Sequence, residues 1–485
     1  MRSCVGRFAM VSLFSRDLAF AHAFGEAYKL PLPLHFYLLS AGVVLLLSFL
    51  LLSMLAQGQN SRFGAVLTKF YEFNREFEIV TSFCNHMVFA LKVLGVALFA
   101  VVFYAACFGT TETFRNFAPV FVWVVWWVGL SLFCAVGGNI WPVVDPWRTI
   151  GKVVRAFLPA TKRSSYVFPE WLSGWLTVFS FLIFSTSELV WGLMNDPRAI
   201  GVFIIFYSVF TWGGYAVFGI EAWIKHADPL AKMFSVLGEV AIFDGRQDGI
   251  RLRLPGFGAV ASSHYRMTDA VFVILMLATI SFDGVLEVLP EGILNPGWIR
   301  EIFLKPVFSE VGPIGLAIYE RNISKICVYF LVFLTWWFSF YGANVLSLRF
   351  QRNSEKSAVE MVIQSAGSLI PIAVAYHFAH YLGYLLITGQ YMIALISDPF
   401  GYGWNIFGTR HYQNDIGVIT AQVAWYLSLG AIILGHVLSL CIAHLRVQQI
   451  DPVSGTTTWA QVPMLLVMIV YTVIGLWLLA QPITV

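Results

Sequence analysis

Charged residues are scarce in this chain, at 12% of its 485 residues, whereas hydrophobic residues make up 58%. A soluble domain carries roughly 25% charged residues. The mean hydropathy is correspondingly high, at +0.75. Heptad repeats, low-complexity tracts and long polar linkers are also missing from the sequence. These shortages exclude a soluble globular protein and a coiled coil, so we expect an integral membrane protein.

Cysteine is also rare, and the six cysteines form no CxxC pair. This scatter excludes a disulfide framework and a thiolate metal site. Walker, GxSxG and HExxH motifs are absent, as is a GxGxxG placed to bind a nucleotide. The net charge of +3 gives no case for a nucleic-acid partner. The partners we expect are membrane lipid and a small apolar substrate.

Apolar runs long enough to cross a bilayer recur from end to end. They predict spans near 35–56, 86–108, 117–137, 171–193, 199–221, 267–289, 325–347, 367–396, 417–445 and 460–480. The predicted fold is therefore an all-α polytopic transmembrane bundle of about ten helices. Residues 22–485 would form one integral membrane domain, preceded by a candidate signal peptide at residues 1–21.

The loops carry an uneven share of lysine and arginine. If the N-terminus lies outside, the inner loops hold more than twice as many of these residues as the outer loops. Cytoplasmic loops carry such an excess, so we predict that both termini lie outside. The loops at 290–324 and 397–416 would then face outward, and the loop at 222–266 would face inward. The alternating sequence of that inner loop predicts a short β-hairpin.

The first 21 residues have a basic start, a short apolar run and a small-x-small ending, Ala19-Phe20-Ala21. This pattern is typical of a cleaved signal peptide, although Arg16 interrupts the apolar region. Cleavage would make His22 the N-terminal residue, whose amine and imidazole could chelate a metal ion. Without cleavage, His22 has no such role.

Histidines in two late spans form the first candidate site. His377 and His380 are three residues apart and share a helix face. His436, in the next span, is predicted at a similar depth, so the three imidazoles could meet. Three histidines suit a divalent metal, zinc or copper, or iron, and two histidines from different helices could hold a haem. The alternative is a hydrogen-bonded cluster that joins the helices.

The outward loop SDPFGYGWNIFGTRHYQND forms the second candidate site. Asp398, His411 and Asp415 offer ligand or general-base chemistry, and Arg410 could hold a polarised phosphoryl oxygen. The glycines of this loop permit tight turns. The alternative is a belt of interfacial aromatic residues with helix caps.

Three charged residues lie within apolar runs: Glu188, Asp283 and Lys92. Buried ions of opposite sign usually pair, so these residues predict either a structural ion pair or a path for protons or ions. Several Asp-Pro pairs lie near span ends. We interpret them as helix punctuation, because proline stops a helix and aspartate can cap the next one.

Five segments of the chain resemble a bacterial family of multi-spanning membrane proteins commonly called fenitrothion hydrolases. They are AHAFGEAYKLPLPL (21–34), NFAPVFVWVVWWVGL (116–130), GGNIWPVVDPWRT (137–149), LIPIAVAYHFAHYLGYLL (369–386) and SDPFGYGWNIFG (397–408). The family name implies cleavage of the P–O–aryl bond of a phosphorothioate triester. The resemblance also implies a place in the bacterial cytoplasmic (inner) membrane.

A neutral triester partitions into membranes, so an aromatic pocket facing the bilayer is a suitable place to bind it. A bound metal would lower the pKa of an attacking water. His22, His411, Asp398 and Asp415 could bind such a metal outside, or His377, His380 and His436 within. Two other functions stay open: a haem or copper membrane protein, and a small-molecule permease that uses the buried histidines.

Overall fold

The computed structural model describes most of the chain. The described residues are 28–56, 78–79, 84–157, 166–192, 195–246, 249–262, 265–308, 310–350, 357–450 and 457–483. The candidate signal peptide at 1–21 and the candidate metal ligand His22 lie outside them.

Helices account for most of the described residues. The long ones are α2 (Leu34–Ala56), α4 (Cys84–Phe108), α9 (Trp175–Leu189), α10 (Pro197–Phe218), α14 (Met267–Val288), α17 (Pro313–Phe350), α19 (Ile370–Ile387), α21 (Ala421–Ile450) and α22 (Thr457–Ile483). Shorter α-helices are α5 (Phe117–Val120), α6 (Ser131–Gly137), α7 (Trp141–Val144), α8 (Pro146–Phe157), α11 (Ile220–His226), α12 (Pro229–Gly238), α13 (Phe257–Ala261), α15 (Glu291–Leu294), α16 (Lys305–Val307), α18 (Ala358–Ser365) and α20 (Tyr391–Ser397). The 3₁₀ and π segments are η3 (Thr113–Arg115), η4 (Phe121–Leu130), η6 (Glu170–Leu172), η8 (Arg300–Leu304), η9 (Ala366–Leu369), η10 (Thr388–Gln390) and η11 (Ile416–Val418).

Ten helical segments of the described chain are long and apolar enough to cross a membrane. They run over Leu34–Met54, His86–Phe108, Phe117–Gly137, Glu170–Leu189, Pro197–Phe218, Met267–Val288, Pro313–Phe350, Ala358–Ser397, Ala421–Arg446 and Trp459–Gln481. Each corresponds to one predicted span, so the predicted all-α polytopic bundle is confirmed. The seventh span differs most, because α17 begins at Pro313 rather than near residue 325. Which side of the membrane each loop faces stays a prediction.

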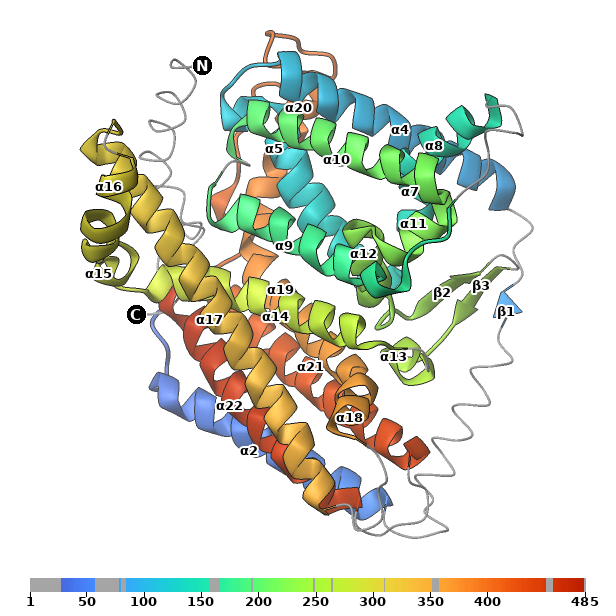
Figure 1. Ribbon diagram of the computed structural model, residues 1–485, viewed down its shortest axis with the longest axis vertical. Helices are drawn as coiled ribbons and strands as arrows, with labels where there is room; N and C mark the ends of the chain where they lie inside the picture. Colours follow the sequence, from blue (N-terminus) through green and yellow to red (C-terminus); the bar gives the residue numbers. More distant parts are fainter. Residues whose placement is uncertain are drawn as a thin grey trace.

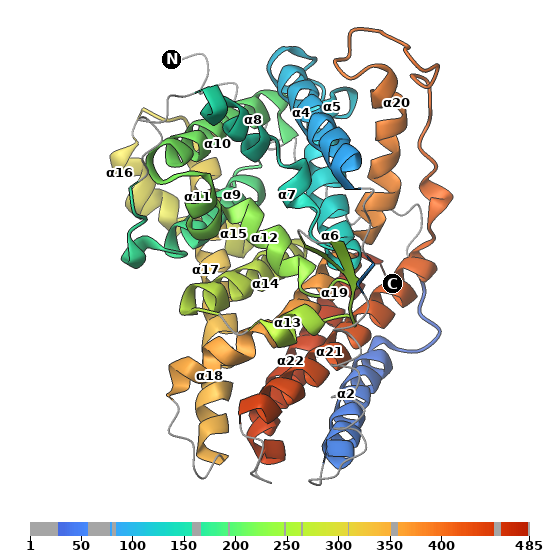
Figure 2. The same ribbon diagram turned by 90° about the vertical axis from the view of Figure 1, so that its right-hand side faces the viewer.

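The long helices form two packed groups (Figures 1 and 2). In one group α22 packs between α2 and α17, and α21 packs on α19. In the other, α4 packs on α10 and α5, and α12 packs on α6. Helices α14 and α19 join the groups, because α14 contacts α9 and α19 contacts η4. The main core cluster of buried apolar side chains includes residues of both groups.

The third span is not a regular α-helix. Residues Phe121–Leu130, with the sequence FVWVVWWVGL, wind as a π-helix between α5 and α6. Such wide turns inside helices are rare and occur often at functional sites. The π-helix turns Trp123 and Trp127 into the core, whereas Trp126 lines a cavity described below.

The hairpin predicted within residues 222–266 is confirmed, whereas its place on the inner side stays a prediction. Strands β2 (Phe243–Arg246) and β3 (Gly249–Leu252) pair antiparallel, with Phe243 opposite Leu252. The short strand β1 (Glu78–Ile79) adds to the other edge of β3. These three strands form one small sheet, and they are the strands found among the described residues.

Three of the Asp-Pro pairs begin helices, as predicted. Asp228 accepts backbone N–H groups of Leu230 and Ala231 at the start of α12. Asp196 caps α10 by accepting from the Arg198 N–H. Asp145 precedes α8 and accepts from the Arg148 N–H at 3.1 Å. Proline at the first helical position suits each start, since its missing N–H would have no partner there.

Candidate functional site

A large apolar cavity of about 720 Å³ opens among α4, η4, α8, α10 and the α19–α20 junction. Most of its wall is aliphatic or aromatic. Its aromatic lining is Phe99, Phe121, Trp126, Phe133, Trp141, Trp147, Phe184, Phe203 and Tyr207. Pockets for small molecules commonly measure about 300–1,000 Å³ and are mostly apolar. The cavity therefore has the size and chemistry of a binding site for one small apolar molecule.

Two polar side chains in the cavity wall are held by residues behind it. The Tyr207 hydroxyl donates to Asp228 at 2.9 Å. Gln390 bridges the cavity wall and the outward loop. Its Oε1 accepts from the Asp415 N–H at 2.8 Å, and its Nε2 donates to the Asp415 carbonyl at 2.9 Å. Both polar groups are therefore oriented by the fold before any ligand binds.

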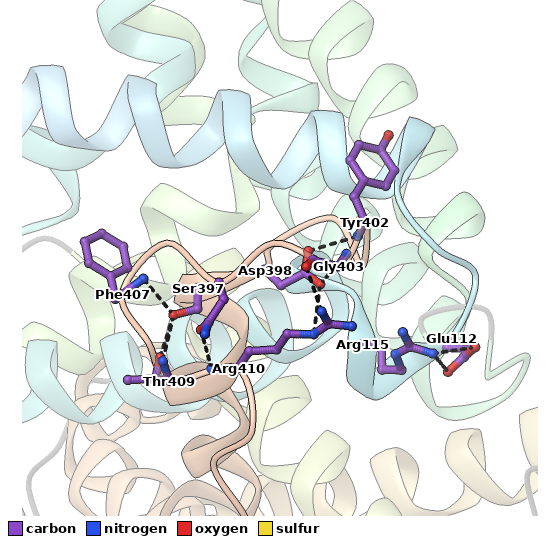
Figure 3. A network of polar contacts seen from close by, with 10 residues as sticks. Glu112, Arg115, Ser397, Asp398, Tyr402, Gly403, Phe407, Thr409 and Arg410 are labelled. Carbon is purple, nitrogen blue, oxygen red and sulfur yellow. Dashed lines mark hydrogen bonds and ion pairs between the residues drawn. The ribbon is translucent and has the colours of Figure 1, made fainter.

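The Asp398 and Arg410 side chains shape the outward loop (Figure 3). Asp398, 7% exposed, accepts backbone N–H groups from Tyr402 at 2.9 Å and Gly403 at 2.8 Å. Arg410 donates to the Gly403 carbonyl at 2.7 Å, and its Nε lies 3.9 Å from Asp398. The positive φ of Gly403, 94°, is a left-handed conformation that suits glycine. The predicted tight turns are confirmed, and these two candidate catalytic residues hold them in place.

The loop is anchored on the corner between α4 and α5. The Thr110 N–H donates to the Phe400 carbonyl at 2.9 Å, and the Phe117 N–H donates to the Pro399 carbonyl at 3.0 Å. The Tyr402 hydroxyl reaches the Phe108 carbonyl at the end of α4. These backbone contacts fix the loop above the helices that enclose the cavity.

The other two candidate catalytic residues, His411 and Asp415, lie in the last part of the same loop, and both are exposed. Asp415 accepts from the Gly417 N–H at 2.8 Å and so caps η11. Tyr412 donates to Gln390 at 3.1 Å, and the Thr409 hydroxyl bonds to the Ile393 carbonyl. Since Gln390 and Ile393 line the cavity, this segment, with His411 in it, lies at the edge of the cavity. Asp398 and Arg410 therefore shape the first part of the loop, whereas Asp415 caps the helix that follows it.

The candidate histidines lie on neighbouring helices, because α19 packs closely on α21. His380 bonds through Nε2 to Asp283 on α14, at 2.9 Å. The Tyr381 hydroxyl donates to the same Asp283 oxygen at 2.9 Å. His380 is thus the partner of a buried carboxyl group.

His377 and His436 are also buried. The His377 ring packs edge-to-face on Tyr381, and on Trp127 at a greater distance. The Nδ1 of His436 bonds to the Ile432 carbonyl of its own helix at 2.8 Å. Among the described residues, no group of three or more His, Cys, Asp or Glu side chains is arranged to hold a metal ion. This arrangement gives no support to a zinc or copper ion shared by His377, His380 and His436, and the metal site and the haem alternative both stay predictions.

The sequence suggests Lys92 as the partner of a buried carboxyl group, but a different lysine takes this position in the structure. The lysine that approaches Asp283 is Lys325, on α17, which also donates to the Leu189 carbonyl at 3.2 Å. Glu188 lies close enough to Asp283 for their carboxyl groups to interact electrostatically. Lys325 is a functional candidate that the sequence reasoning missed. Its position inside a predicted span was the signal that could have revealed it.

No family model, curated protein or solved structure matches this chain. The fold defines the class: an all-α, multi-pass membrane protein. The site adds an apolar cavity under an anchored loop, beside a buried group of acidic, basic and histidine side chains.

Proposed function

We propose that this chain is a membrane protein that binds one small, uncharged, apolar molecule taken up from the bilayer. One observation carries the proposal: the cavity of about 720 Å³ whose wall is aliphatic and aromatic. A neutral phosphorothioate triester with an aryl group, the substrate class that the resemblance implies, has this chemistry.

Dispersion and shape would decide the affinity of this cavity. Lipid tails are as apolar as the cavity wall, so leaving the bilayer brings little hydrophobic gain. A packed aromatic wall makes more contacts per atom than fluid lipid does. Edge-to-face and offset-stacked ring pairs add about 0.5–1.5 kcal/mol each. The site would therefore prefer aromatic ligands to aliphatic ones of equal size.

Filling the cavity is expected to abolish tight binding. Gly389 lines the cavity, and a Cβ there would meet only Val124 Cγ1, at 3.5 Å. Gly389→Leu places a branched side chain in the ligand's space without displacing backbone. We expect the affinity for a neutral nitrophenyl phosphorothioate triester to fall at least about tenfold, which is about 1.4 kcal/mol. Equilibrium binding to the purified protein in lipid nanodiscs measures this.

The matched control is Gly213→Leu. Gly213 is an exposed residue of α10 outside the cavity wall, and nothing lies within 4 Å of its added Cβ. Binding should be unchanged in this variant. Equal affinities in wild type, Gly389→Leu and Gly213→Leu would place the ligand elsewhere and contradict the proposal.

Hydrolysis of the bound triester is a second candidate function, favoured by the position of the outward loop. The segment from Thr409 to Asp415 bonds to the cavity-lining residues Gln390 and Ile393. An exposed imidazole at this edge, His411, could accept a proton from water. The water oxygen would then bond to phosphorus, and the P–O bond would break to release an aryloxide. A nitroaryloxide leaves readily, so no strong general acid is needed.

His411→Ala is therefore expected to abolish hydrolysis of a chromogenic nitrophenyl triester by membranes that contain the protein. Removing a general base typically costs 10²–10⁴-fold in rate. His86→Ala is the matched control, because His86 is exposed and belongs to the first turn of α4, far from the loop at that helix's other end. Full activity in His411→Ala membranes with normal expression would remove His411 from the reaction but leave the binding proposal intact.

The proposed location is the cytoplasmic membrane of a bacterium, with the outward loop on the outer side. The excess of lysine and arginine in the predicted inner loops supports this orientation. Substrate would then enter the cavity sideways from the lipid, and a polar product would leave toward the outer water.

A further inference from the structure

The Asp283 carboxyl lies where a membrane protein rarely places a charge. It belongs to α14, the most buried of the ten spans, and the surrounding residues include Phe282 and Tyr329 of the core. A charged side chain inside a membrane is costly, and such residues often mark proton or ion sites. The polar surroundings of Asp283 therefore need an explanation.

Four helices bring titratable groups to this point. Helix α19 contributes His380 and Tyr381, each 2.9 Å from the Asp283 Oδ2. Helix α9 contributes Glu188, and α17 contributes Lys325. Glu287, one turn further along α14, also acts on His380, and Tyr384 of α19 is near both Glu188 and Asp283. Three carboxyl groups and an imidazole in one apolar region cannot all be ionised at low cost.

Two stripes of charge connect this group with the end of the bundle. Asp283 and Glu287 are four residues apart on α14, and Arg321 and Lys325 are four residues apart on α17, which packs on α14. Glu291 begins α15, just beyond the end of α14. Residues four apart lie on one helix face. Arg321 and Glu291 pair at 3.7 Å, with side chains 31% and 52% exposed. The Asp283 and His380 side chains are less exposed, at 16% and 8%.

We propose that Asp283 and His380 form a proton-binding site within the membrane-spanning bundle. The site exchanges its proton with water along the stripe that ends at Glu291 and Arg321. Lys325 balances the negative charge of the Asp283 and Glu188 carboxyl groups. Tyr381 orients the Asp283 oxygen that faces His380. This site goes beyond ligand binding and does not depend on the apolar cavity being occupied.

Infrared difference spectra of the full-length protein in lipid nanodiscs test the site directly. Spectra at about pH 8 and about pH 5 bracket the range in which histidine titrates. The wild type should show coupled changes in imidazole and carboxyl bands. Asp283→Asn keeps an oxygen that can accept from Tyr381, and His380→Gln keeps a hydrogen-bond donor. Because the pair shares one proton, each variant should lose both changes.

Asp269→Asn is the matched control. Asp269 lies on the same helix, at its other end, in an ion pair with Lys232 at 2.7 Å. Its variant should keep the coupled signal. Absence of the coupled signal from the wild type would overturn the proposal, as would its persistence in Asp283→Asn. If Glu188→Gln loses the coupled signal while Asp283→Asn and His380→Gln keep it, the proton belongs to Glu188, and the assignment to Asp283 and His380 is overturned.

Discussion

Asp145→Asn is expected to make the protein progressively more stable than the wild type as the pH rises from about 4 to about 7. Asp145 is 2% exposed and lies outside the membrane spans. Burial, and then the nearby Asp228, raise the pKa of the Asp145 carboxyl to about 7. The nearby cation does not pair with it, because the Arg148 guanidinium bonds to Glu221 at 2.8 and 2.9 Å.

The direction of the pH dependence follows from proton binding in the two states. Below about pH 4, folded and unfolded chains both hold the Asp145 proton. Between about pH 4 and pH 7 the unfolded chain has lost this proton and the folded chain retains it, so stability falls with pH. Each pH unit in this range lowers the free energy of unfolding by about 1.4 kcal/mol, and the full loss is on the order of 4 kcal/mol. Asparagine has no proton to lose, yet its side-chain oxygen still accepts from the Arg148 N–H.

Unfolding free energies in detergent, measured across this pH range, give the difference between wild type and Asp145→Asn. Asp196→Asn is the matched control, since Asp196 begins α10 with the same Asp-Pro pair at a half-buried position. The Asp145→Asn difference should change more steeply with pH than the Asp196→Asn difference, because Asp145 is the more deeply buried of the two carboxyl groups. A flat difference for Asp145→Asn would show that the folded protein holds this carboxylate without penalty, and would contradict the account.

Arg446→Met is expected to destabilise the protein by about 3 kcal/mol or more. The Arg446 side chain is 7% exposed and donates to the backbone carbonyls of Ala259, Ser262 and Gln364. Its guanidinium also lies 4.7 Å from the centre of the Tyr265 ring. One side chain thus joins α21 to α13 and α18. Removing it leaves buried carbonyls without donors, each at about 1–3 kcal/mol.

Arg349→Met is the control, because Arg349 is exposed in the last turn of α17. This variant should lose less than about 1 kcal/mol of unfolding free energy, which is what a cation near a helix C-terminus contributes. Arg446→Lys should fall between the two, since an ammonium keeps the charge but cannot reach three carbonyls in the planar arrangement of a guanidinium. Dodecyl sulfate unfolding compares the three variants. Equal stability of Arg446→Met and Arg349→Met would contradict the role assigned to Arg446.

The spans were predictable because hydropathy is a local property that accumulates along the chain. The third span, Phe117–Gly137, and the second, His86–Phe108, end at the predicted residues. The Asp-Pro helix starts at Asp196 and Asp228 were predictable for the same reason, since a cap and its helix are adjacent in sequence. The hairpin at Phe243–Leu252 likewise depends on neighbouring residues.

The sites were harder to predict because they depend on which helices become neighbours. Lys325 rather than Lys92 approaches Asp283 because α17, and not α4, packs on α14. Asp398 has the chemistry of a metal ligand or a general base, yet both of its carboxyl oxygens accept hydrogen bonds from backbone N–H groups of its own loop. The cavity combines α4, α10, a π-helix and the α19–α20 junction, and no local sequence pattern specifies that combination.

Photolabelling tests the central claim, that the cavity binds an apolar molecule from the bilayer, most directly. A neutral aryl diazirine is activated in nanodiscs that contain the protein, and the labelled peptides are mapped by mass spectrometry. We expect adducts on Phe121–Leu130 and at Met392 and Ile393, and we expect excess unlabelled aryl triester to suppress them. Adducts spread over the exposed face of α2, where Leu47 and Leu51 lie, without suppression by the triester, would contradict it.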